Sequence, residues 1–328
     1  MSTLPNQTWP SQPERGVLDS LRSIGREGPH LLKELAAQAD VELDGHRPWD
    51  IRVHDSAFYD RVLSAGSLGL GESYMDQQWD APALDETFTR LLGNGIEARL
   101  HGAAGLGLRW RLALLVLRAR LLNLQSPERA FQVGEQHYDV GNDLYEAMLD
   151  PTMSYSCGYW AEADDLESAQ RAKLDLICRK LELEPGERVL DIGCGWGGLA
   201  EHAARHYDVQ VVGLTVSREQ AQLARQRCAG LPVDIRLQDY RELDGRFDKI
   251  ASVGMFEHVG RKNDAAFFDA AARLLKEEGL FLLHSIGTSA VNPVNDPWID
   301  RYIFPNGELP NVERLAKALQ PRFVLEDW

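Results

Sequence analysis

The chain has 328 residues, 44% of them hydrophobic and 26% charged, which is enough for two domains with sizeable cores. Its formal net charge of −15 excludes the broadly basic surface that non-specific nucleic-acid binding requires, so we expect no nucleic-acid partner. The four cysteines form no CxxC pair and have no histidine at zinc-ligand spacing. We therefore expect no disulfide framework, no metal site and a cytoplasmic location.

The first part of the chain carries mainly helical patterns. Residues 1–15 are polar and proline-rich, and we expect a disordered tail there without a signal peptide. Residues 16–125 combine helical stretches such as HLLKELAAQAD with short alternating ones such as WDIRVHD, which predicts a smaller, mostly helical domain. The longest apolar run, LALLVL, is too short to span a membrane. A helix-start signal, SPER, places the domain boundary between residues 125 and 126.

The remaining residues, 126–328, alternate between strand and helix patterns, which predicts an α/β fold with a parallel sheet. The expected elements are, in chain order, a helix near 165–182, a strand at 188–192, a helix at 198–206, a strand at 209–214, a helix at 217–229, strands at 233–237 and 247–253, a helix at 263–276, a strand at 279–285, a helix at 311–319 and a last strand at 322–328.

A glycine-rich turn follows the first strand of this run. The sequence GCGWGG opens a helix, and Gly193, Gly195 and Gly197 permit close approach of the backbone to a ligand. The spacing is neither GxGxxG nor GxxxxGK[ST], so pyrophosphate is not the expected ligand. Asp191 precedes the first glycine by two residues, where its carboxylate can face a cationic ligand. A tight strand–helix turn alone would explain the glycines but not the carboxylate.

Polar residues also follow the second strand. Many adenosylmethionine enzymes carry an acidic residue there for the ribose hydroxyls, whereas this chain has Thr215 and Gln220, which can form neutral hydrogen bonds instead. The same stretch also predicts a helix cap, with Ser217 at the N-cap and Gln220 three residues later. Both interpretations can hold together.

The third strand is followed by Gln238, Asp239 and Tyr240, at the position where methyltransferases bind adenine. Together with the glycine turn and the carboxylate before it, these residues favour S-adenosylmethionine as the cofactor.

Several motifs occur in a characteristic order. LDIGCGWGG, GLTVSREQ, LQDYRE, SVGMFEHVG, FLLHSIG and DPWIDRYIFPNGELP follow HYDVGNDLYEAMLDPTMSYSCGYW and, further upstream, GSLGLGESYMDQQWD. From about residue 50 to the end, this combination resembles the cyclopropane-fatty-acyl-phospholipid synthases, which are related to the mycolic acid cyclopropane synthases. The resemblance implies a Rossmann-like class I adenosylmethionine-dependent methyltransferase. It also implies transfer of a methylene unit to a cis double bond of a phospholipid acyl chain.

The resemblance further implies a catalytic group built around bound bicarbonate, which removes a proton from a carbocation. Glu257 and His284 would hold the bicarbonate by their side chains, and Cys157 and Ile286 by backbone N–H groups. Glu257 follows the fourth strand and His284 ends the fifth, so both belong to the ligand-binding edge of a parallel sheet. Alkene methylation needs no thiol nucleophile, and we expect Cys157 to act only through its backbone.

We assign Tyr155 and Ser156 to the cofactor site as well. The rings of Tyr155, Tyr159, Trp160 and Phe256 could stabilise a sulfonium or a carbocation, with core packing as the alternative and, for Trp160, the favoured one. We expect His258 to orient the loop that carries Glu257.

Two further regions follow from the resemblance. His137 and Tyr138 belong to a segment that lies over the cofactor in the family, either as a flexible cover or as a packed helix. The first domain is expected to dock on the inner membrane peripherally and to mediate homodimerisation. The arginine-rich stretch RWRLALLVLRARLL shows no clean amphipathic face, so we assign it no anchoring role.

The family pattern continues beyond Trp328, including a tyrosine of the bicarbonate site. On this ground we expect an incomplete catalytic domain with weak or absent cyclopropanation. The alternatives are a C-methyltransferase that leaves a methyl or methylene branch, and an inactive form that binds cofactor or lipid.

Overall fold

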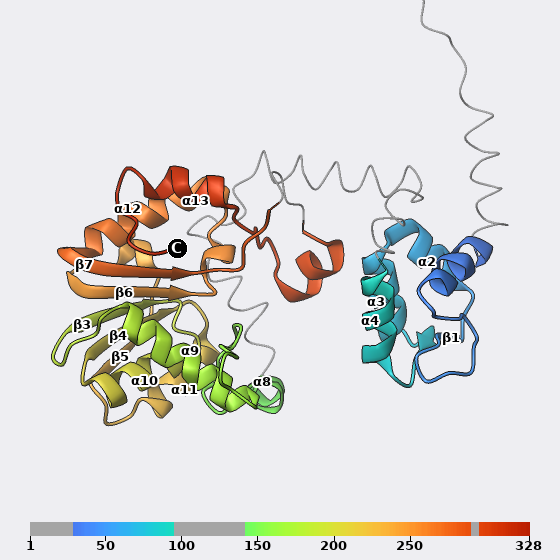
Figure 1. Ribbon diagram of the computed structural model, residues 1–328, viewed down its shortest axis with the longest axis horizontal. Helices are drawn as coiled ribbons and strands as arrows, with labels where there is room; N and C mark the ends of the chain where they lie inside the picture. The colour runs from blue at the N-terminus through green and yellow to red at the C-terminus, as the bar shows by residue number, and fades with distance from the viewer. Residues whose placement is uncertain (1–28, 95–141, 290–294) are drawn as a thin grey trace, which may run out of the picture. The chain divides into compact units, whose positions relative to one another are not determined.

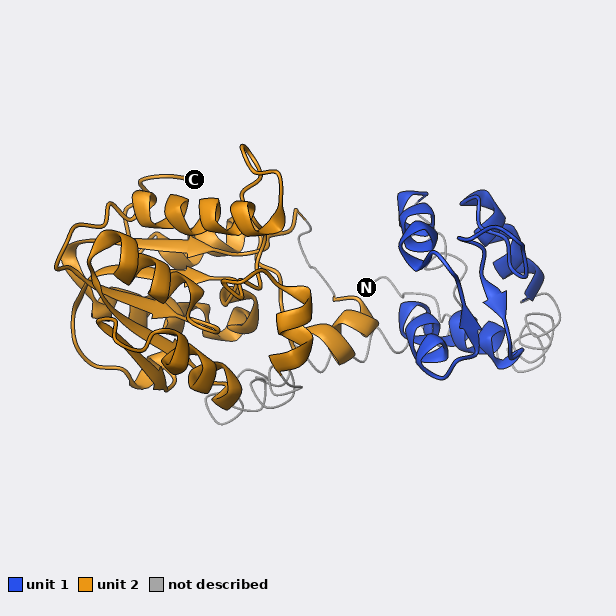
Figure 2. Ribbon diagram, turned by 90° about the horizontal axis from the view of Figure 1, so that it is seen from below, with its two compact units in different colours: residues 1–118 blue, residues 119–328 orange. Residues whose placement is uncertain are grey.

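A computed structural model describes residues 29–94, 142–289 and 295–328 (Figure 1). The chain divides into two compact units, residues 1–118 and 119–328 (Figure 2). The expected tail, the arginine-rich stretch, the domain boundary and the segment of His137 and Tyr138 lie outside the described residues and stay predictions. Within the described parts, no helix combines the length and apolar content needed to cross a bilayer.

The first unit is small and mostly helical, as predicted. Its elements are a helix at 29–38, β1 (Arg52–Val53), α2 (Ala57–Ala65), α3 (Ser67–Met75), β2 (Trp79–Asp80) and α4 (Leu84–Gly93). The two short strands pair antiparallel. Phe58 and Trp79 are buried at the centre of the core, and the Trp79 indole donates to the carbonyl oxygen of Leu70, 3.0 Å away. This bond anchors β2 to α3. The first five residues of α3 include Ser67, Gly69 and Gly71, which are weak helix formers.

The second unit is built on a five-stranded parallel sheet with the order β5-β4-β3-β6-β7. Its strands are β3 (Arg188–Ile192), β4 (Gln210–Thr215), β5 (Val233–Leu237), β6 (Phe247–Val253) and β7 (Leu275–His284). Its helices are α8 (Asn142–Met148), α9 (Leu166–Lys180), α10 (Gly198–Tyr207), α11 (Arg218–Arg227), η2 (Tyr240–Glu242), η3 (Phe256–His258), η4 (Arg261–Asn263), α12 (Asp264–Leu274), the π-helical turn η5 (Ile299–Ile303) and α13 (Val312–Leu319). The strand order reverses at β3, next to β6.

Helices cover both faces of this sheet, as Figure 1 shows. Alternate strand residues point to opposite faces, so Val189 and Val211 join the small side chains of α10 and α11, whereas Leu190 and Val212 join the aromatic cluster under α12. Because helices cover both faces at the centre of the sheet, β3 and β4 are buried at every residue but the first.

The five parallel strands confirm the predicted fold class, but the last predicted strand is wrong. Residues 322–328 form no strand. The backbone N–H groups of Arg322 and Phe323 bond to the carbonyl of Leu319, so the chain here forms a turn that closes α13. Phe323 packs on the core, while Val324 is 84% exposed. A strand pattern by itself is therefore insufficient, because a strand forms only when its backbone pairs with that of another strand.

Phe268 lies at the centre of the aromatic cluster and is fully buried, with its ring 5.2–5.4 Å from those of Phe256 and Phe267. We expect Phe268→Ala to lower the free energy of unfolding by about 3–5 kcal/mol, because it removes a large buried ring and leaves a cavity. Urea unfolding of the full chain measures this. Leu325→Ala is the matched control, because that side chain is 61% exposed, and its cost should stay below about 0.5 kcal/mol. Equal costs would contradict this placement of the core.

Candidate active site

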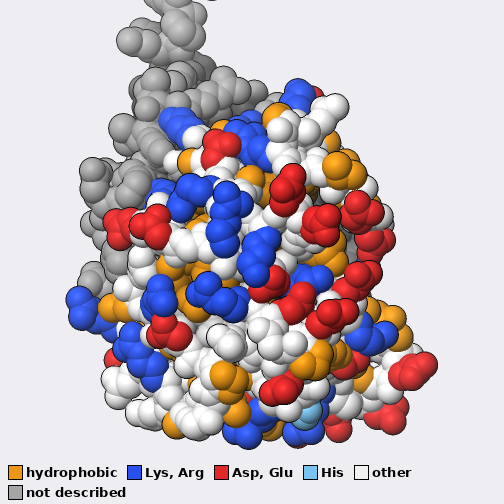
Figure 3. All heavy atoms as spheres, turned by 90° about the vertical axis from the view of Figure 1, so that its left-hand side faces the viewer, with side chains coloured by type: hydrophobic (Ala, Val, Ile, Leu, Met, Phe, Trp, Pro, Cys, Tyr) orange, Lys and Arg blue, Asp and Glu red, His pale blue; other side chains and the backbone are white. Residues whose placement is uncertain are grey.

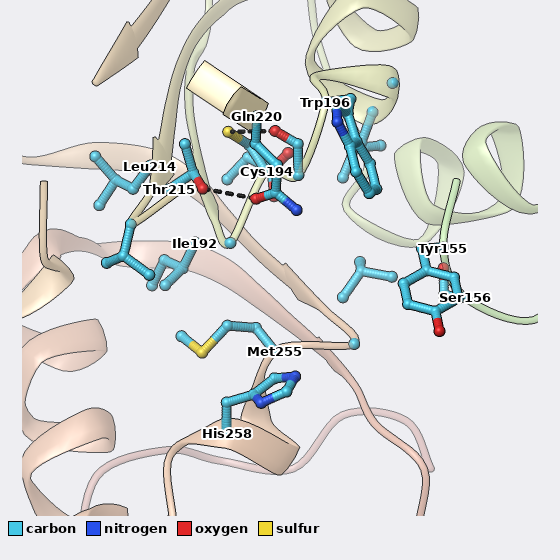
Figure 4. Close-up of a pocket in the computed structure, with 18 of the residues that line it drawn as sticks. Tyr155, Ser156, Ile192, Cys194, Trp196, Leu214, Thr215, Gln220, Met255 and His258 are labelled. Carbon is cyan, nitrogen blue, oxygen red and sulfur yellow. Dashed lines mark hydrogen bonds between the residues drawn. The ribbon is translucent and has the colours of Figure 1, made fainter. Parts of the chain in front are cut away.

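The sheet opens a cavity at the carboxyl ends of its strands, at the reversal point beside β3 and β6. Parallel α/β sheets bind ligands there because the helices that follow the two central strands diverge to opposite faces. The cavity is lined from the 153–156 segment, α9 and four strand ends, by residues that include Met153, Ser154, Tyr155, Ser156, Lys173, Asp191, Gly193, Gly195, Trp196, Thr215, Gln220, Gln238, Asp239, Tyr240, Arg241, Gly254, Met255 and His258 (Figure 4). Of the cofactor residues predicted from the sequence, only Gly197 does not line it.

Two glycines of the turn have no room for a side chain. Gly193 has φ +88°, and a Cβ there would lie 2.7 Å from the Met255 side chain at the end of β6. At Gly198 a Cβ would lie 2.4 Å from the carbonyl oxygen of Thr152. The turn is therefore held between the 150–156 segment and the loop after β6, and its backbone borders the cavity.

Neutral hydrogen bonds organise the end of β4. The Thr215 hydroxyl donates to Gln220 Oε1 at 2.7 Å, as Figure 4 shows, and both residues are buried. The Gln220 N–H donates to Ser217 Oγ, so Ser217 also caps α11. The cap predicted at Ser217 is confirmed, whereas hydrogen bonds from Thr215 and Gln220 to the ribose stay a prediction. No acidic side chain is needed to keep these groups in the cavity wall.

At the end of β5, the carboxylate of Asp239 is engaged by Arg241, whose Nε and Nη2 lie 2.8 and 2.5 Å from its oxygens. Arg241 lines the cavity too, and the sequence analysis missed it. The two hydrogen bonds from Arg241 fix the position of the Asp239 carboxylate. They also use part of the capacity of its oxygens to accept hydrogen bonds from a ligand.

Two buried groups of opposite charge face the cavity. Asp191 is 2% exposed, and burial raises the pKa of its carboxyl to about 7, with Lys173 acting in the opposite direction. Lys173 is 6% exposed and donates to Ser156 Oγ at 2.8 Å, and burial lowers its pKa to about 8. Sequence reasoning missed Lys173. Its signal was its helical spacing with Gln170, Leu174 and Ile177, which puts a lysine on the buried face of α9.

Trp196, inside the glycine turn, was missed as well. Its indole N–H donates to Asn142 Oδ1 at 2.9 Å, and its ring lies 4.6 Å from that of Tyr145. These contacts tie α8 to the glycine turn, whose residue Trp196 lines the cavity.

The four residues predicted for catalysis form two pairs in contact, Glu257 with Ile286 and Cys157 with His284. The Ile286 N–H donates to Glu257 Oε1 at 2.6 Å, and Cys157 Sγ lies 3.4 Å from His284 Nε2. Glu257 Oε2 and His284 Nδ1 are buried and have no hydrogen-bond partner among the described residues. Burial lowers the pKa of His284, and the nearby Lys173 lowers it further, so the neutral imidazole is favoured.

The aromatic residues divide between two environments. Phe256 is fully buried in the core cluster, whereas Tyr155 lines the cavity. Trp160 is 53% exposed, so the core packing that we favoured for it is wrong. The loop that carries Trp160 lies between α8 and α9 and forms no part of the sheet. His258 lines the cavity one residue after Glu257, and its ring meets Phe304 edge-on at 5.5 Å.

Charge on the surface is mixed despite the acidic total. On the face in Figure 3, basic side chains gather toward the centre and acidic ones toward one margin. Many basic groups are paired, such as Lys276 with Asp248 and Arg322 with Asp269. Such exposed pairs contribute little to stability but keep basic charge from forming one continuous patch.

A parallel sheet that reverses at β3, with a glycine turn, a buried carboxylate and polar strand ends around one cavity, defines a class I adenosylmethionine-dependent methyltransferase. The family model described as mycolic acid cyclopropane synthetase matches residues 125–328. The chain belongs to this family.

Individual relatives agree. The chain is 54% identical over 298 residues to the cyclopropane-fatty-acyl-phospholipid synthase of Escherichia coli K12, covering 91% of this chain and 76% of that protein. Among solved structures, a cyclopropane synthase from Mycobacterium tuberculosis matches with a TM-score of 0.54 and 36% identity, over 57% of this chain and 72% of that one. A mycolic acid cyclopropane synthase complexed with SAH and CTAB matches with a TM-score of 0.55 and 37% identity, over 58% and 74%.

The raised pKa of Asp191 makes the stability of the cofactor-free protein depend on pH. An unfolded aspartate ionises near pH 4, while the folded carboxyl keeps its proton up to about pH 7. Folding stability should therefore fall as pH rises from about 4 to 7 and then level off. Asn cannot ionise, so we expect Asp191→Asn to raise the melting temperature relative to the wild type more at pH 8 than at pH 5. An equal difference at both pH values would contradict this.

Proposed function

We propose that this methyltransferase adds a methylene unit from S-adenosylmethionine to a cis double bond in a phospholipid acyl chain and closes a cyclopropane ring. The observation that carries the proposal is the 54% identity, over 91% of the chain, with a cyclopropane-fatty-acyl-phospholipid synthase. When bound, the cofactor supplies an electrophilic methyl group. The acyl-chain alkene attacks that methyl carbon and becomes a carbocation. Removal of a proton from the added methyl group then leaves the electron pair that closes the ring.

This chemistry needs a base within reach of the added methyl group and a site that excludes water, because the carbocation would otherwise be trapped. We propose that bicarbonate supplies the base, held by Glu257 and His284. Their unpartnered atoms support this, since Glu257 Oε2 can accept a hydrogen bond and His284 Nδ1–H can donate one. Bicarbonate carries both an O–H donor and acceptor oxygens. Cys157 supports the tautomer, because its thiol lies at His284 Nε2 and leaves the proton on Nδ1.

The other two residues take supporting parts in this proposal. The N–H of Ile286 is engaged by Glu257 Oε1, so Ile286 orients the carboxylate and can meet bicarbonate only through a change of partner. Cys157 would offer its backbone N–H. The cofactor site comprises Tyr155, Ser156, Asp191, the glycine turn, Thr215, Gln220 and the residues 238–240 after β5.

We expect Glu257→Gln to lower the rate of cyclopropanation by about 100-fold or more while SAH binding is retained. The change removes the carboxylate that accepts a hydrogen bond from the bicarbonate in this proposal. Mass spectrometry of phospholipids from cells that express the chain measures the product. Glu278→Gln, an exposed carboxylate on β7, is the matched control and should leave the rate unchanged. Full activity of the Glu257 variant would refute the assigned role.

The same measurement separates the alternatives. A gain of one methylene mass without a residual double bond identifies a cyclopropane. A gain with retained unsaturation identifies a branched product, which the similarity to a probable fatty acid methyltransferase of Pseudomonas putida, 48% identical over 195 residues, makes the second candidate. No gain with SAH binding intact would favour a form that only binds cofactor.

Cys157→Ser should keep most of the activity, because a hydroxyl can still donate to His284 Nε2 and the backbone N–H is unchanged. The initial rate of product formation by purified protein on vesicles measures this. A folded serine variant without activity would show that the thiol itself is required.

We also propose that the protein acts at the cytoplasmic face of the inner membrane, with residues 16–125 as a docking and dimerisation domain and residues 126–328 as the catalytic domain. Three exposed aromatic or aliphatic side chains near the proposed catalytic site support contact with lipid: Tyr159, Trp160 and Ile286.

We expect Trp160→Ala to weaken co-sedimentation with phosphatidylglycerol-containing vesicles. We also expect light scattering of the protein without vesicles to report a dimer. Unchanged co-sedimentation would remove Trp160 from the membrane contact.

A further inference from the structure

We propose that Lys173, together with Ser156, binds the α-carboxylate of the cofactor's methionine tail. The inference rests on the adenosylmethionine site of the proposed function and adds the residue that recognises one charged group of the ligand. Lys173 comes from α9, outside the strand-end motifs from which the site was predicted.

The ammonium group of Lys173 is buried without a negatively charged partner in the described part of the chain, so an anionic group of a ligand would stabilise it. Its ammonium is buried in the wall of the cofactor cavity and donates to Ser156 Oγ at 2.8 Å. Among the described residues, no carboxylate lies within 4.0 Å of it. A buried ammonium with one neutral partner is costly unless a ligand supplies the counter-charge. Its pKa, lowered to about 8 by burial, agrees with that lack.

Asp191 is a second buried ionisable group in the wall of the same cavity. It lies at the end of β3, and its Oδ2 is buried without a hydrogen-bond partner among the described residues. Lys173 and Asp191 thus face one cavity without pairing with each other. An ammonium and a carboxyl group in the wall of one cavity complement a ligand that carries both a carboxylate and an ammonium. The methionine tail does so, with an ammonium and a carboxylate on the same carbon.

The helix α9 positions Lys173 and its partner together. Gln170, one turn earlier on the same buried face, donates through Nε2 to the carbonyl oxygens of Ser156 at 2.7 Å and Ser154 at 3.2 Å. The Ser156 hydroxyl accepts from Lys173, which leaves its own proton free to donate to a carboxylate oxygen. One helix face therefore fixes both donors of a carboxylate site.

Three ligands test the proposal by titration calorimetry: SAH, its decarboxylated form, which keeps the amine, and 5′-methylthioadenosine, which has no amino-acid tail. We expect Lys173→Met to weaken SAH by about 10- to 100-fold, the range for hydrogen bonds to charged groups. Binding of the other two ligands should stay unchanged, since neither has a carboxylate. Lys180→Met is the matched control, because Lys180 lies on α9 but is exposed.

Each other outcome overturns the proposal. Equal weakening of all three ligands would make Lys173 a structural residue only, and unchanged SAH binding would exclude contact with the carboxylate. If the wild type binds none of the three, the adenosylmethionine site itself is refuted. Ser156→Ala provides a second test if Lys173→Met fails to fold, because Ser156 is only partly buried and the change removes a single hydroxyl. That variant should weaken SAH and leave 5′-methylthioadenosine unaffected, and any other result with it counts against the proposal.

Discussion

The divergence of the chain after the neighbouring strands β3 and β6 is the constraint on which the rest of the catalytic unit depends. These strands are neighbours, yet the helices that follow them pack on opposite faces of the sheet, so the backbone must part between them. Gly193 permits this geometry because any side chain there would collide with Met255. The cavity, the buried carboxylate before the glycine turn and the loop that carries Glu257 all follow from this parting of the two strands.

The segment at 150–157 contacts both the wall of the cofactor cavity and His284. Asp150 accepts from the N–H groups of Thr152 and Ser154 and shapes the turn. The residues that follow contribute first to the cofactor cavity, through Ser156, and then to the histidine beside it, through Cys157. A displacement of this short segment would therefore disturb both the cofactor cavity and the surroundings of His284.

The fold alone does not select the substrate. Coclaurine N-methyltransferase has the same fold, with a TM-score of 0.57 at 22% identity over 84% of this chain. What differs between such enzymes is carried by the strand-end loops. In this chain the loop after β6 carries a carboxylate, Glu257, and the last residue of β7 is a histidine, His284. Segment 305–310 fixes the loop after β6, since the N–H of Glu308 donates to the carbonyl oxygen of Glu257.

The sequence by itself determined that the sheet is parallel, how strands and helices alternate along the chain, and which polar residues follow the strands. Hydrophobic periodicity, glycine turns and helix caps are local signals, so they can be seen without the tertiary structure. The sequence also placed Asp191 and Thr215 at the cavity. It failed at residues 322–328, where strand formation depends on a partner that no local pattern reports. The engagement of Asp239 by Arg241, the exposure of Trp160 and the burial of Lys173 were decided only by the tertiary structure. Each depends on how segments distant in the chain pack, and a buried lysine becomes informative only when its uncompensated charge is seen facing the cavity.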